Sequence, residues 1–188
     1  MRKPLFLSEN TRHRVGQGII IFLAIVALIG LGDSVLIHLK EIAGKTDPSV
    51  FNSCSVSDVI SCSKVANSQY SNIFGLPVSL IGIMFYEGIL LLCGALWFGL
   101  DTSSNLKLLL SLIISLALFF SLRLLYFSYL GLGAICPYCA VSNLTTSLIA
   151  LGWFWYLNQK ALVFALLCGL AVYCLYVFLI ANWLASRF

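Results

Sequence analysis

The sequence predicts an all-α membrane protein, and its composition, the length of its apolar stretches and the spread of its charge lead to that fold class. Hydrophobic residues make up 61% of the 188 residues and charged residues 10%, a balance outside the range of soluble domains. A soluble fold of this size cannot bury so much apolar surface, so lipid must cover it. The formal net charge of +4 is small and scattered, which indicates no nucleic-acid partner.

Five apolar stretches are each long enough to cross about 30 Å of hydrocarbon at about 1.5 Å per residue. The first is long and has no small-residue cleavage site before the polar loop, which favours a retained helix over a cleaved signal peptide. We therefore expect transmembrane helices at residues 15–39, 76–100, 106–130, 134–157 and 161–185.

Basic residues near the helix ends indicate how the chain is oriented in the membrane. The N-terminal segment 1–14 carries four Lys and Arg residues, which places it in the cytoplasm. Lys107 and Lys160 then fall on the same side, at the turns 101–105 and 158–160. The prediction rests mainly on the N-terminal segment, since four other basic residues fall on the opposite side: Lys40, Lys45, Lys64 and Arg187. With this topology the loop 40–75 and the turn 131–135 both face outward, in a compartment where disulfides form and persist.

Cys136 and Cys139 form a C-P-Y-C motif at the start of the fourth predicted helix. Zinc needs further ligands, and the only histidines of the chain are His38 and His13, which is expected on the far side of the membrane. A c-type haem needs a histidine directly after the motif, where Ala140 stands. Redox chemistry is the remaining use, because the N–H groups and dipole of a helix N-terminus stabilise a thiolate. The proline of the motif suits the first helical turn.

The second pair, Cys54 and Cys62, lies in the outward loop with seven residues between the two cysteines. Ser57 or Asp58 is expected to cap a short helix that runs through Val65 on the membrane surface. Alone, the pair suits a structural disulfide, which stabilises a fold by about 2–3 kcal/mol. A second pair on the same face favours thiol–disulfide exchange instead, because a loop can bring a thiolate to a disulfide sulfur. Four cysteines allow three pairings, and all three remain open.

The other sulfur-bearing and ionisable residues within the spans are assigned structural roles. Buried free cysteines behave as small apolar residues, which is the role expected of Cys93, Cys168 and Cys174. Three ionisable residues fall at similar depths in neighbouring helices. We expect Arg123 to pair with Glu87 or Asp33, and this network to hold the helices together rather than to relay protons.

The stretch from Ile60 to Gly75 carries a cysteine, a serine six residues later and a final Phe-Gly, and in these features it resembles the vitamin K epoxide reductase family. The C-x7-C spacing, the C-x-x-C at the fourth helix and the order of helices are also similar, and the resemblance covers residues 15–157. It implies a four-helix bundle around a quinone site, with the loop as a cap and a fifth helix outside the bundle. Ubiquinone or menaquinone is the implied cofactor.

The resemblance also implies a role for each of the four cysteines. Cys54 exchanges with a partner protein, and Cys62 passes electrons to Cys136 through a transient disulfide. Cys139 faces the quinone and donates to it as a thiolate. Ser68 matches the loop serine near the quinone ring.

Further residues are candidates for the quinone site. The positions of the vertebrate quinone-binding Asn and Tyr are taken here by Val78 and Asn143, so vitamin K epoxide is not the expected substrate, and Asn143 is a hydrogen-bond donor to the quinone. An apolar pocket with a few polar groups suits such a ring. Its candidate walls are Phe74, Phe85, Tyr86 and Tyr138.

The bacterial members of the family indicate the partner and the domain organisation. The expected catalytic domain is 15–157, followed by a fifth helix and C-terminus at 158–188, with no fused thioredoxin-like domain. We therefore expect a separate periplasmic thioredoxin-fold protein, similar to DsbA, as the partner of an inner-membrane thiol oxidoreductase. Alternatives are a vitamin K or quinone reductase, a carrier that reduces outer proteins, and a membrane scaffold with a stapled loop. A DsbB-like protein has its two cysteine pairs in the reverse order.

Overall fold

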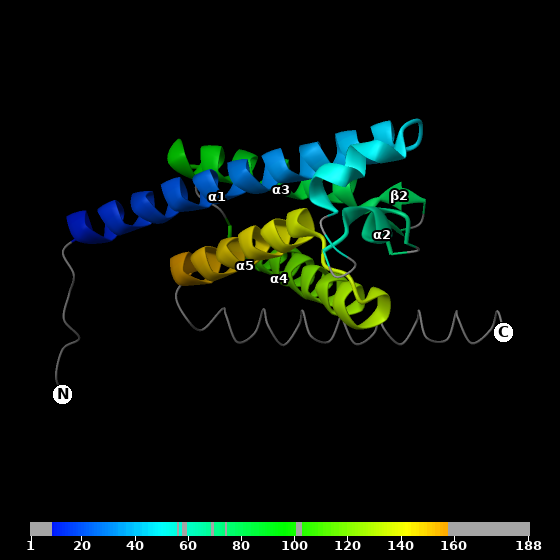
Figure 1. The fold of residues 1–188 in the computed structure, drawn as a ribbon. Helices are drawn as coiled ribbons and strands as arrows, with labels where there is room; N and C mark the ends of the chain where they lie inside the picture. Colours follow the sequence, from blue (N-terminus) through cyan, green and yellow to red (C-terminus); the bar gives the residue numbers. More distant parts are fainter. Residues whose placement is uncertain are drawn as a thin grey trace.

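The computed structural model describes residues 9–55, 57, 60–68, 70–73, 75–100 and 103–157. In this part of the chain, four long helices form a bundle and short elements cover one end of it (Figure 1). The long helices are α1 (Glu9–Gly44), α3 (Val78–Trp97), α4 (Ser104–Tyr126) and α5 (Pro137–Leu157). They follow the order of the first four predicted spans. The fifth predicted span, 161–185, lies outside the described residues.

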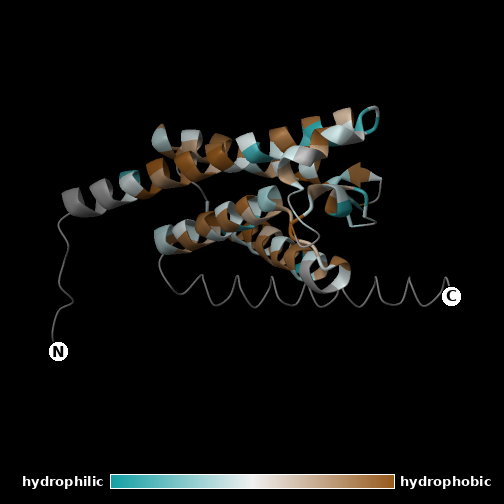
Figure 2. Cartoon of the chain, in the orientation of Figure 1, coloured by the Kyte–Doolittle hydropathy of each residue, from teal (hydrophilic) through white to brown (hydrophobic). Residues whose placement is uncertain are grey.

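Apolar residues run along the long helices (Figure 2), and many of their side chains are exposed on the outside of the bundle. Leu91 is 76% exposed and Leu28 is 57% exposed, although both lie in the middle of helices. Water does not favour so many exposed apolar side chains, whereas lipid does. Within the described residues, three helical segments are long and apolar enough to cross a membrane: Gly16–Gly44, Val78–Trp97 and Ser104–Tyr126. The protein is therefore an all-α integral membrane protein.

Helix α5 forms where the fourth span is predicted, although it is not one of these three segments. At about 1.5 Å per residue its 21 residues reach about 31 Å. Its polar residues turn into the bundle, where the buried Tyr86 hydroxyl of α3 lies 2.7 Å from Thr145 Oγ1 and 3.0 Å from Thr146 Oγ1. The same hydroxyl donates to the Ser142 carbonyl at 2.9 Å. These polar side chains lower the hydropathy of α5 without facing lipid.

Glycines let α1 and α3 approach each other closely. Gly30 of α1 lies against the ring of Tyr86, and a Cβ at this position would overlap the ring. One turn further along, a Cβ on Gly82 of α3 would lie 2.7 Å from Ser34 Oγ of α1. Small residues at a helix seam increase van der Waals contact between helices inside a membrane. The two helices are therefore held at a distance that larger residues would not allow.

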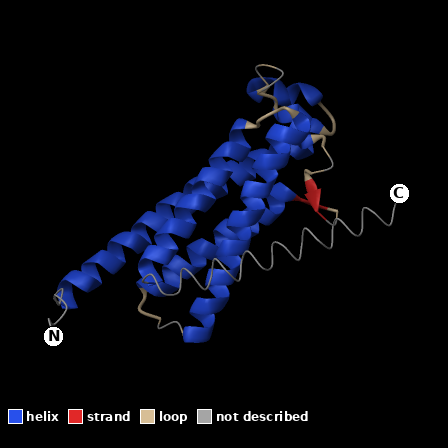
Figure 3. Ribbon diagram, turned by 90° about the horizontal axis from the view of Figure 1, so that it is seen from below, coloured by secondary structure: helices blue, strands red, loops and turns tan. Residues whose placement is uncertain are grey.

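Short elements cap the end of the bundle at which α1 ends and α5 begins (Figure 3). They are the 3-10 helix η1 (Pro48–Cys54), α2 (Cys62–Ala66), β1 (Asn72–Ile73) and β2 (Leu76–Pro77). The two strands form an antiparallel hairpin in which Ile73 pairs with Leu76. Gly75 has a φ of 83° in the turn between them, a left-handed conformation that glycine adopts without strain. Tyr70 stacks on Phe127 at 5.2 Å, beyond the end of α4.

The short helix of the loop begins later than predicted. Its N-cap is Ser61, whose hydroxyl accepts a hydrogen bond from Lys64 N at 3.4 Å. Ser57 instead accepts from Ile60 N in a preceding turn, at 3.1 Å. Ile60 forms a parallel bridge with Ile135, so its backbone is extended and a helix cannot pass through it. The expectation that Ser57 or Asp58 caps this helix is therefore wrong.

Candidate thiol–disulfide exchange site

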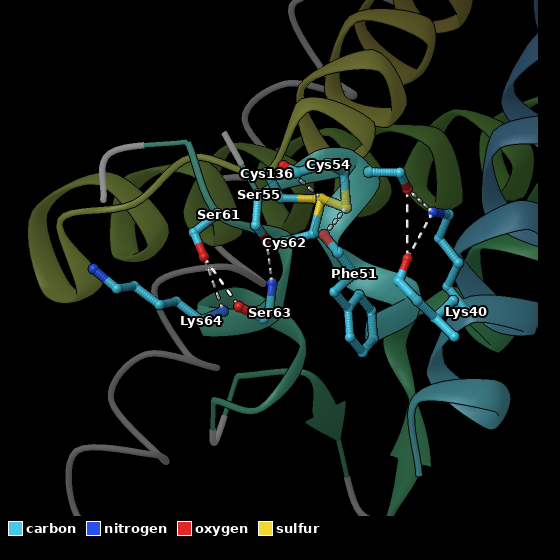
Figure 4. The surroundings of a disulfide bond; sticks show 11 residues. Lys40, Phe51, Cys54, Ser55, Ser61, Cys62, Ser63, Lys64 and Cys136 are labelled. Carbon is cyan, nitrogen blue, oxygen red and sulfur yellow. Dashed lines mark hydrogen bonds between the residues drawn. A yellow bond between two sulfur atoms is a disulfide. The ribbon is translucent and has the colours of Figure 1, made fainter. Parts of the chain in front are cut away.

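The fold brings the loop cysteines to the C-P-Y-C motif, although more than 70 residues separate them in the sequence. Cys54 and Cys62 form a disulfide, while Cys136 and Cys139 are free thiols. The Sγ atoms of Cys62 and Cys136 lie 3.4 Å apart (Figure 4). The structure thus selects one of the three pairings that the sequence allows, and it places a thiol in contact with the disulfide.

Backbone hydrogen bonding positions Cys62 against Cys136. Ile60 and Ile135 pair as a parallel bridge, and Ser61 N donates to the Ile135 carbonyl at 3.2 Å. In this parallel arrangement the two chains advance in the same direction. The next residues, Cys62 and Cys136, therefore come side by side. Extended backbone immediately before each cysteine, rather than the cysteines themselves, fixes their contact.

A lysine holds the segment that carries Cys54. Lys40, near the end of α1, donates from Nζ to the Val50 carbonyl at 3.2 Å and to Ser53 Oγ at 2.7 Å (Figure 4). The same ammonium group lies 5.5 Å from the centre of the Tyr138 ring in the C-P-Y-C motif. One side chain thus contacts both η1 and the motif that begins α5. We call these contacts of Lys40 the lysine latch.

Three local features shape η1 so that Cys54 faces inward. Asp47 caps the first turn by accepting from Ser49 N at 2.9 Å, and this contact lowers the pKa of the Asp47 carboxyl. A proline follows at the first helical position, where a missing N–H costs nothing. Phe51 packs against Gly44, at a place where a Cβ would overlap the Phe51 ring. Cys54 therefore turns toward the bundle.

The C-P-Y-C motif begins α5 as predicted, with Pro137 as the first helical residue. Cys136 precedes the helix, and its carbonyl accepts from Ala140 N at 3.0 Å. Cys139 lies in the first turn of α5, three residues after Cys136, and is half-buried. Unpaired N–H groups at a helix N-terminus stabilise a nearby thiolate, so this position favours a nucleophilic sulfur.

The reacting sulfurs are shielded from solvent. Cys54, Cys62 and Cys136 are each at most 5% exposed, and together with Phe51 they form one buried apolar cluster. In such surroundings a small reductant from water has little access to the disulfide, whereas Cys136 already touches it. The burial therefore favours exchange within the molecule over reaction with free thiols.

Behind Cys139 lie two buried polar groups that lack partners. Asn143 is one helical turn after Cys139 and 8% exposed, and its Nδ2 finds no hydrogen-bond partner within the described part of the chain. Asp33 of α1 is also 8% exposed, and its Oδ2 is likewise unpartnered there. Buried polar groups are normally hydrogen-bonded, so two such atoms are suited to contact a polar ligand group. A quinone carbonyl fits this need.

The other predicted quinone contacts are placed as follows. Ser68 lies just after the end of α2, with its hydroxyl donating to the Val65 carbonyl at 2.7 Å. Phe85 packs edge-to-face on Tyr86, with ring centres 5.3 Å apart, and the hydroxyl of Tyr86 is used within the bundle. The Tyr138 ring lies under the lysine latch. Phe74 lies outside the described residues. A quinone contact of any of these side chains stays a prediction.

A polar cluster at the outer end of the α1–α3 seam was not foreseen from the sequence. His38 Nδ1 lies 3.0 Å from Ser79 Oγ, and Ser79 also donates to Glu41. His38 and Glu41 are 3.8 Å apart as an i, i+3 pair. The sequence shows that His38 and Glu41 are three residues apart on one helix. It does not show that Ser79 lies opposite them, because that depends on how α1 packs against α3.

The ionisable residues of the spans are found at different degrees of burial. Glu87 is exposed on α3, whereas Asp33 is buried. The guanidinium group of Arg123 lies 4.8 Å from the centre of the Phe127 ring. The predicted pairing of Arg123 with Glu87 or Asp33 stays a prediction.

The fold and the site together define a class: an integral membrane protein that holds a disulfide in contact with a second cysteine pair. The model of the vitamin K epoxide reductase family matches residues 21–153, a range that includes all four of these cysteines. The chain belongs to the vitamin K epoxide reductase family, which is a family of membrane oxidoreductases that use quinones. The resemblance seen in the sequence is thereby confirmed.

Proposed function

We propose that this protein reoxidises a thioredoxin-fold protein and passes the electrons to a membrane quinone, and so supports disulfide formation outside the cytoplasm. The observation that carries the proposal is the 3.4 Å contact between the sulfur of Cys136 and the closed Cys54–Cys62 disulfide. A disulfide with a merely structural role needs no thiol against it. Membership of a quinone-using family supports the choice of acceptor.

The exchange with the partner begins at Cys54. A thiolate of the reduced partner attacks Cys54, the Cys54–Cys62 bond breaks, and Cys62 leaves as a thiolate. The second thiol of the partner then attacks the mixed disulfide. The partner leaves oxidised, and both loop cysteines are reduced. The lysine latch must loosen for this attack, since Cys54 is 5% exposed.

The loop is oxidised again by the C-P-Y-C pair. Cys62 attacks Cys136 of a Cys136–Cys139 disulfide, forming a Cys62–Cys136 bond and releasing Cys139 as a thiolate. Cys54 then attacks Cys62, which restores the loop disulfide and leaves Cys136 reduced. The described state, with the loop disulfide closed and Cys136 in contact with it, has the bonding expected at the end of this exchange.

A quinone accepts the two electrons of the reduced C-P-Y-C pair and becomes a hydroquinone. Cys139 is proposed to face it, and Asn143 is proposed to donate a hydrogen bond to it from its unpartnered Nδ2. A lipophilic acceptor reaches this position from the bilayer.

The proposed catalytic domain is 15–157, followed by a fifth helix in 158–188. The proposed location is the bacterial inner membrane, with the cap on the periplasmic side and a separate DsbA-like partner.

The test is quinone reduction by the purified protein in detergent, with a reduced thioredoxin-fold protein as electron donor and ubiquinone or menaquinone as acceptor. Wild type is compared with Cys54→Ala and Cys139→Ala. We expect turnover by the wild type and none by either variant.

A second readout separates the two halves of the reaction. Wild-type protein prereduced at all four cysteines should reduce quinone without the partner, and Cys54→Ala should do so as well for one turnover. Cys139→Ala should not. Absence of quinone reduction by the wild type with both quinones would remove the proposed acceptor. Full turnover by Cys136→Ala would remove Cys136 from the proposed route of the electrons.

A further inference from the structure

Asp33 is a buried carboxyl group that the exchange between the cysteines does not use. It lies in α1, is 8% exposed, and its Oδ2 has no hydrogen-bond partner in the described part of the chain. Burying a charged carboxylate without a partner is far more costly than burying the neutral acid. A neutral carboxyl group that lacks a partner is both a hydrogen-bond donor and a source of one proton.

The packing of the helices places Asp33 at the level of the C-P-Y-C motif. Gly30 contacts the ring of Tyr86, whose hydroxyl bonds to α5 at Ser142 and Thr145. Asp33 follows Gly30 by three residues, or about 4.5 Å along α1. The chains of α1 and α5 run in opposite directions, so this step leads toward the beginning of α5.

Two further observations agree with this placement. The carboxyl group of Asp33 lies near both Cys136 and Cys139. On α5, Cys139 and Asn143 are four residues apart and therefore share a helix face. Asp33 and Asn143 are thus two unpartnered polar side chains, each more than nine-tenths buried, on the helices that flank Cys139.

We propose that Asp33, as the neutral acid, hydrogen-bonds to a carbonyl oxygen of the membrane quinone and donates a proton to it as the C-P-Y-C pair is oxidised. This inference rests on the proposed function, because it assigns a second polar contact and a proton donor to the same quinone site. Asn143 contacts the quinone as a fixed donor, whereas Asp33 supplies a proton that an amide cannot.

The step balances as follows. Two S–H bonds of Cys136 and Cys139 break, one S–S bond forms, and two electrons pass to the quinone. Two O–H bonds form on the quinone oxygens. Asp33 gives its proton to one of these oxygens and receives one of the two thiol protons in return, and the other thiol proton goes to the second oxygen. The carboxyl group therefore ends each turnover in the state in which it began.

Two substitutions separate binding from proton donation. Asp33→Asn keeps a hydrogen-bond donor of the same shape but has no acidic proton, and Asp33→Leu removes both. The control is Glu87→Gln, the same carboxyl-to-amide change at an exposed position of α3. The assay mixes prereduced protein in detergent with a short-chain ubiquinone and follows a single turnover.

We expect Asp33→Asn to bind quinone about as well as the wild type but to reduce it about 100-fold more slowly, the size of a lost general-acid contribution. Asp33→Leu should lose affinity as well, and Glu87→Gln should match the wild type. The reduction of the loop disulfide by the thioredoxin-fold partner should be unchanged in all three, which reports intact folding. A wild-type rate in Asp33→Asn would overturn the proposal.

A measurement on the wild type alone keeps the inference falsifiable if a variant does not fold. Infrared difference spectra are recorded on protein with ¹³C-labelled aspartate as quinone is added. We expect a protonated carboxyl band that shifts with the label and with quinone binding. An unchanged carboxyl band would overturn the proposal, and so would a band from ionised carboxylate only. If the wild type binds quinone with this band shift but does not reduce it, the proposed function fails while the binding role of Asp33 stands.

Discussion

The contact between Cys62 and Cys136 is the shortest link between the two cysteine pairs, and its surroundings decide how it is used. Exchange requires a thiolate to approach a disulfide sulfur in line with the bond that breaks. Here the approach is prepared by backbone pairing at Ile60 and Ile135. Because the contact sits among buried apolar groups, competing thiols from water are disfavoured. In the proposed relay, this single pair of sulfurs carries the electrons between the loop and α5.

Trapping the intermediate tests this contact directly. In the double variant Cys54→Ala/Cys139→Ala, only Cys62 and Cys136 remain at the site, with their sulfurs 3.4 Å apart in the wild type. We expect mild oxidation to join them in a single disulfide, because no backbone movement is needed. Mass spectrometry of proteolytic peptides identifies the bond.

The matched control retains the other loop cysteine. In Cys62→Ala/Cys139→Ala, Cys54 and Cys136 remain, and we expect their oxidation to be slower. The contact described above belongs to Cys62, and Cys54 is held by η1. Equal or faster bonding of Cys54 to Cys136 would contradict the order of exchange.

At the scale of elements, the lysine latch joins η1 to the beginning of α5. Lys40 binds the Val50 carbonyl and Ser53 Oγ and faces the Tyr138 ring. Lys40→Met keeps the apolar stem but removes the ammonium group. We expect it to destabilise the closed position of η1 by about 1 kcal/mol and to speed reduction of the loop disulfide by a small reductant about fivefold. Thiol titration during reduction with a water-soluble phosphine measures this rate.

Two lysine variants sharpen the comparison. Lys40→Arg keeps the charge and the donors, so its rate should lie close to that of the wild type. Lys45→Met changes an exposed lysine beyond the end of α1 and should have no effect. If Lys40→Met leaves the rate unchanged, the latch does not govern access to Cys54.

The seam between α1 and α3 offers a second test at this scale. Gly30→Ala adds a methyl group that overlaps the Tyr86 ring, and such overpacking costs about 1–3 kcal/mol. The ring must move, which also disturbs its hydrogen bonds to α5. We expect a lower thermal unfolding midpoint in detergent. Gly32→Ala is the matched control on the same helix, because nothing lies within 4 Å of a Cβ there, and it should not lower the midpoint.

For the molecule as a whole, the sequence predicted what the bilayer imposes. A span must be apolar over a fixed length, so the order and approximate limits of α1, α3, α4 and α5 could be read from hydropathy. The meeting of the two cysteine pairs at one end followed from counting spans. Pro137 marked the start of α5 because proline suits a first helical turn.

The features that sequence reasoning missed depend on contacts between distant residues. The pairing of Cys54 with Cys62 follows from how η1 folds back on α1, and the late start of α2 follows from the bridge at Ile60. Sequence reasoning gave Lys40 no partner, since the groups it binds lie 10 and 13 residues ahead. The interior polar face of α5 was hidden because hydropathy does not show that Tyr86 lies opposite it.

The orientation of the whole bundle decides which compartment the disulfide serves. The cap lies at the end of the bundle where α1 finishes, whereas the turn between α3 and α4 lies at the other end. Basic residues in 1–14 predict that the cap faces outward. In protein whose seven native cysteines are replaced, single cysteines are introduced as Thr46→Cys and Ser104→Cys, both at exposed positions. We expect a membrane-impermeant maleimide to label Thr46→Cys in intact spheroplasts, and to label Ser104→Cys only after permeabilisation. The opposite pattern would place the cysteine pairs in the cytoplasm, where disulfides do not persist, and the proposed partner would then be on the wrong side of the membrane.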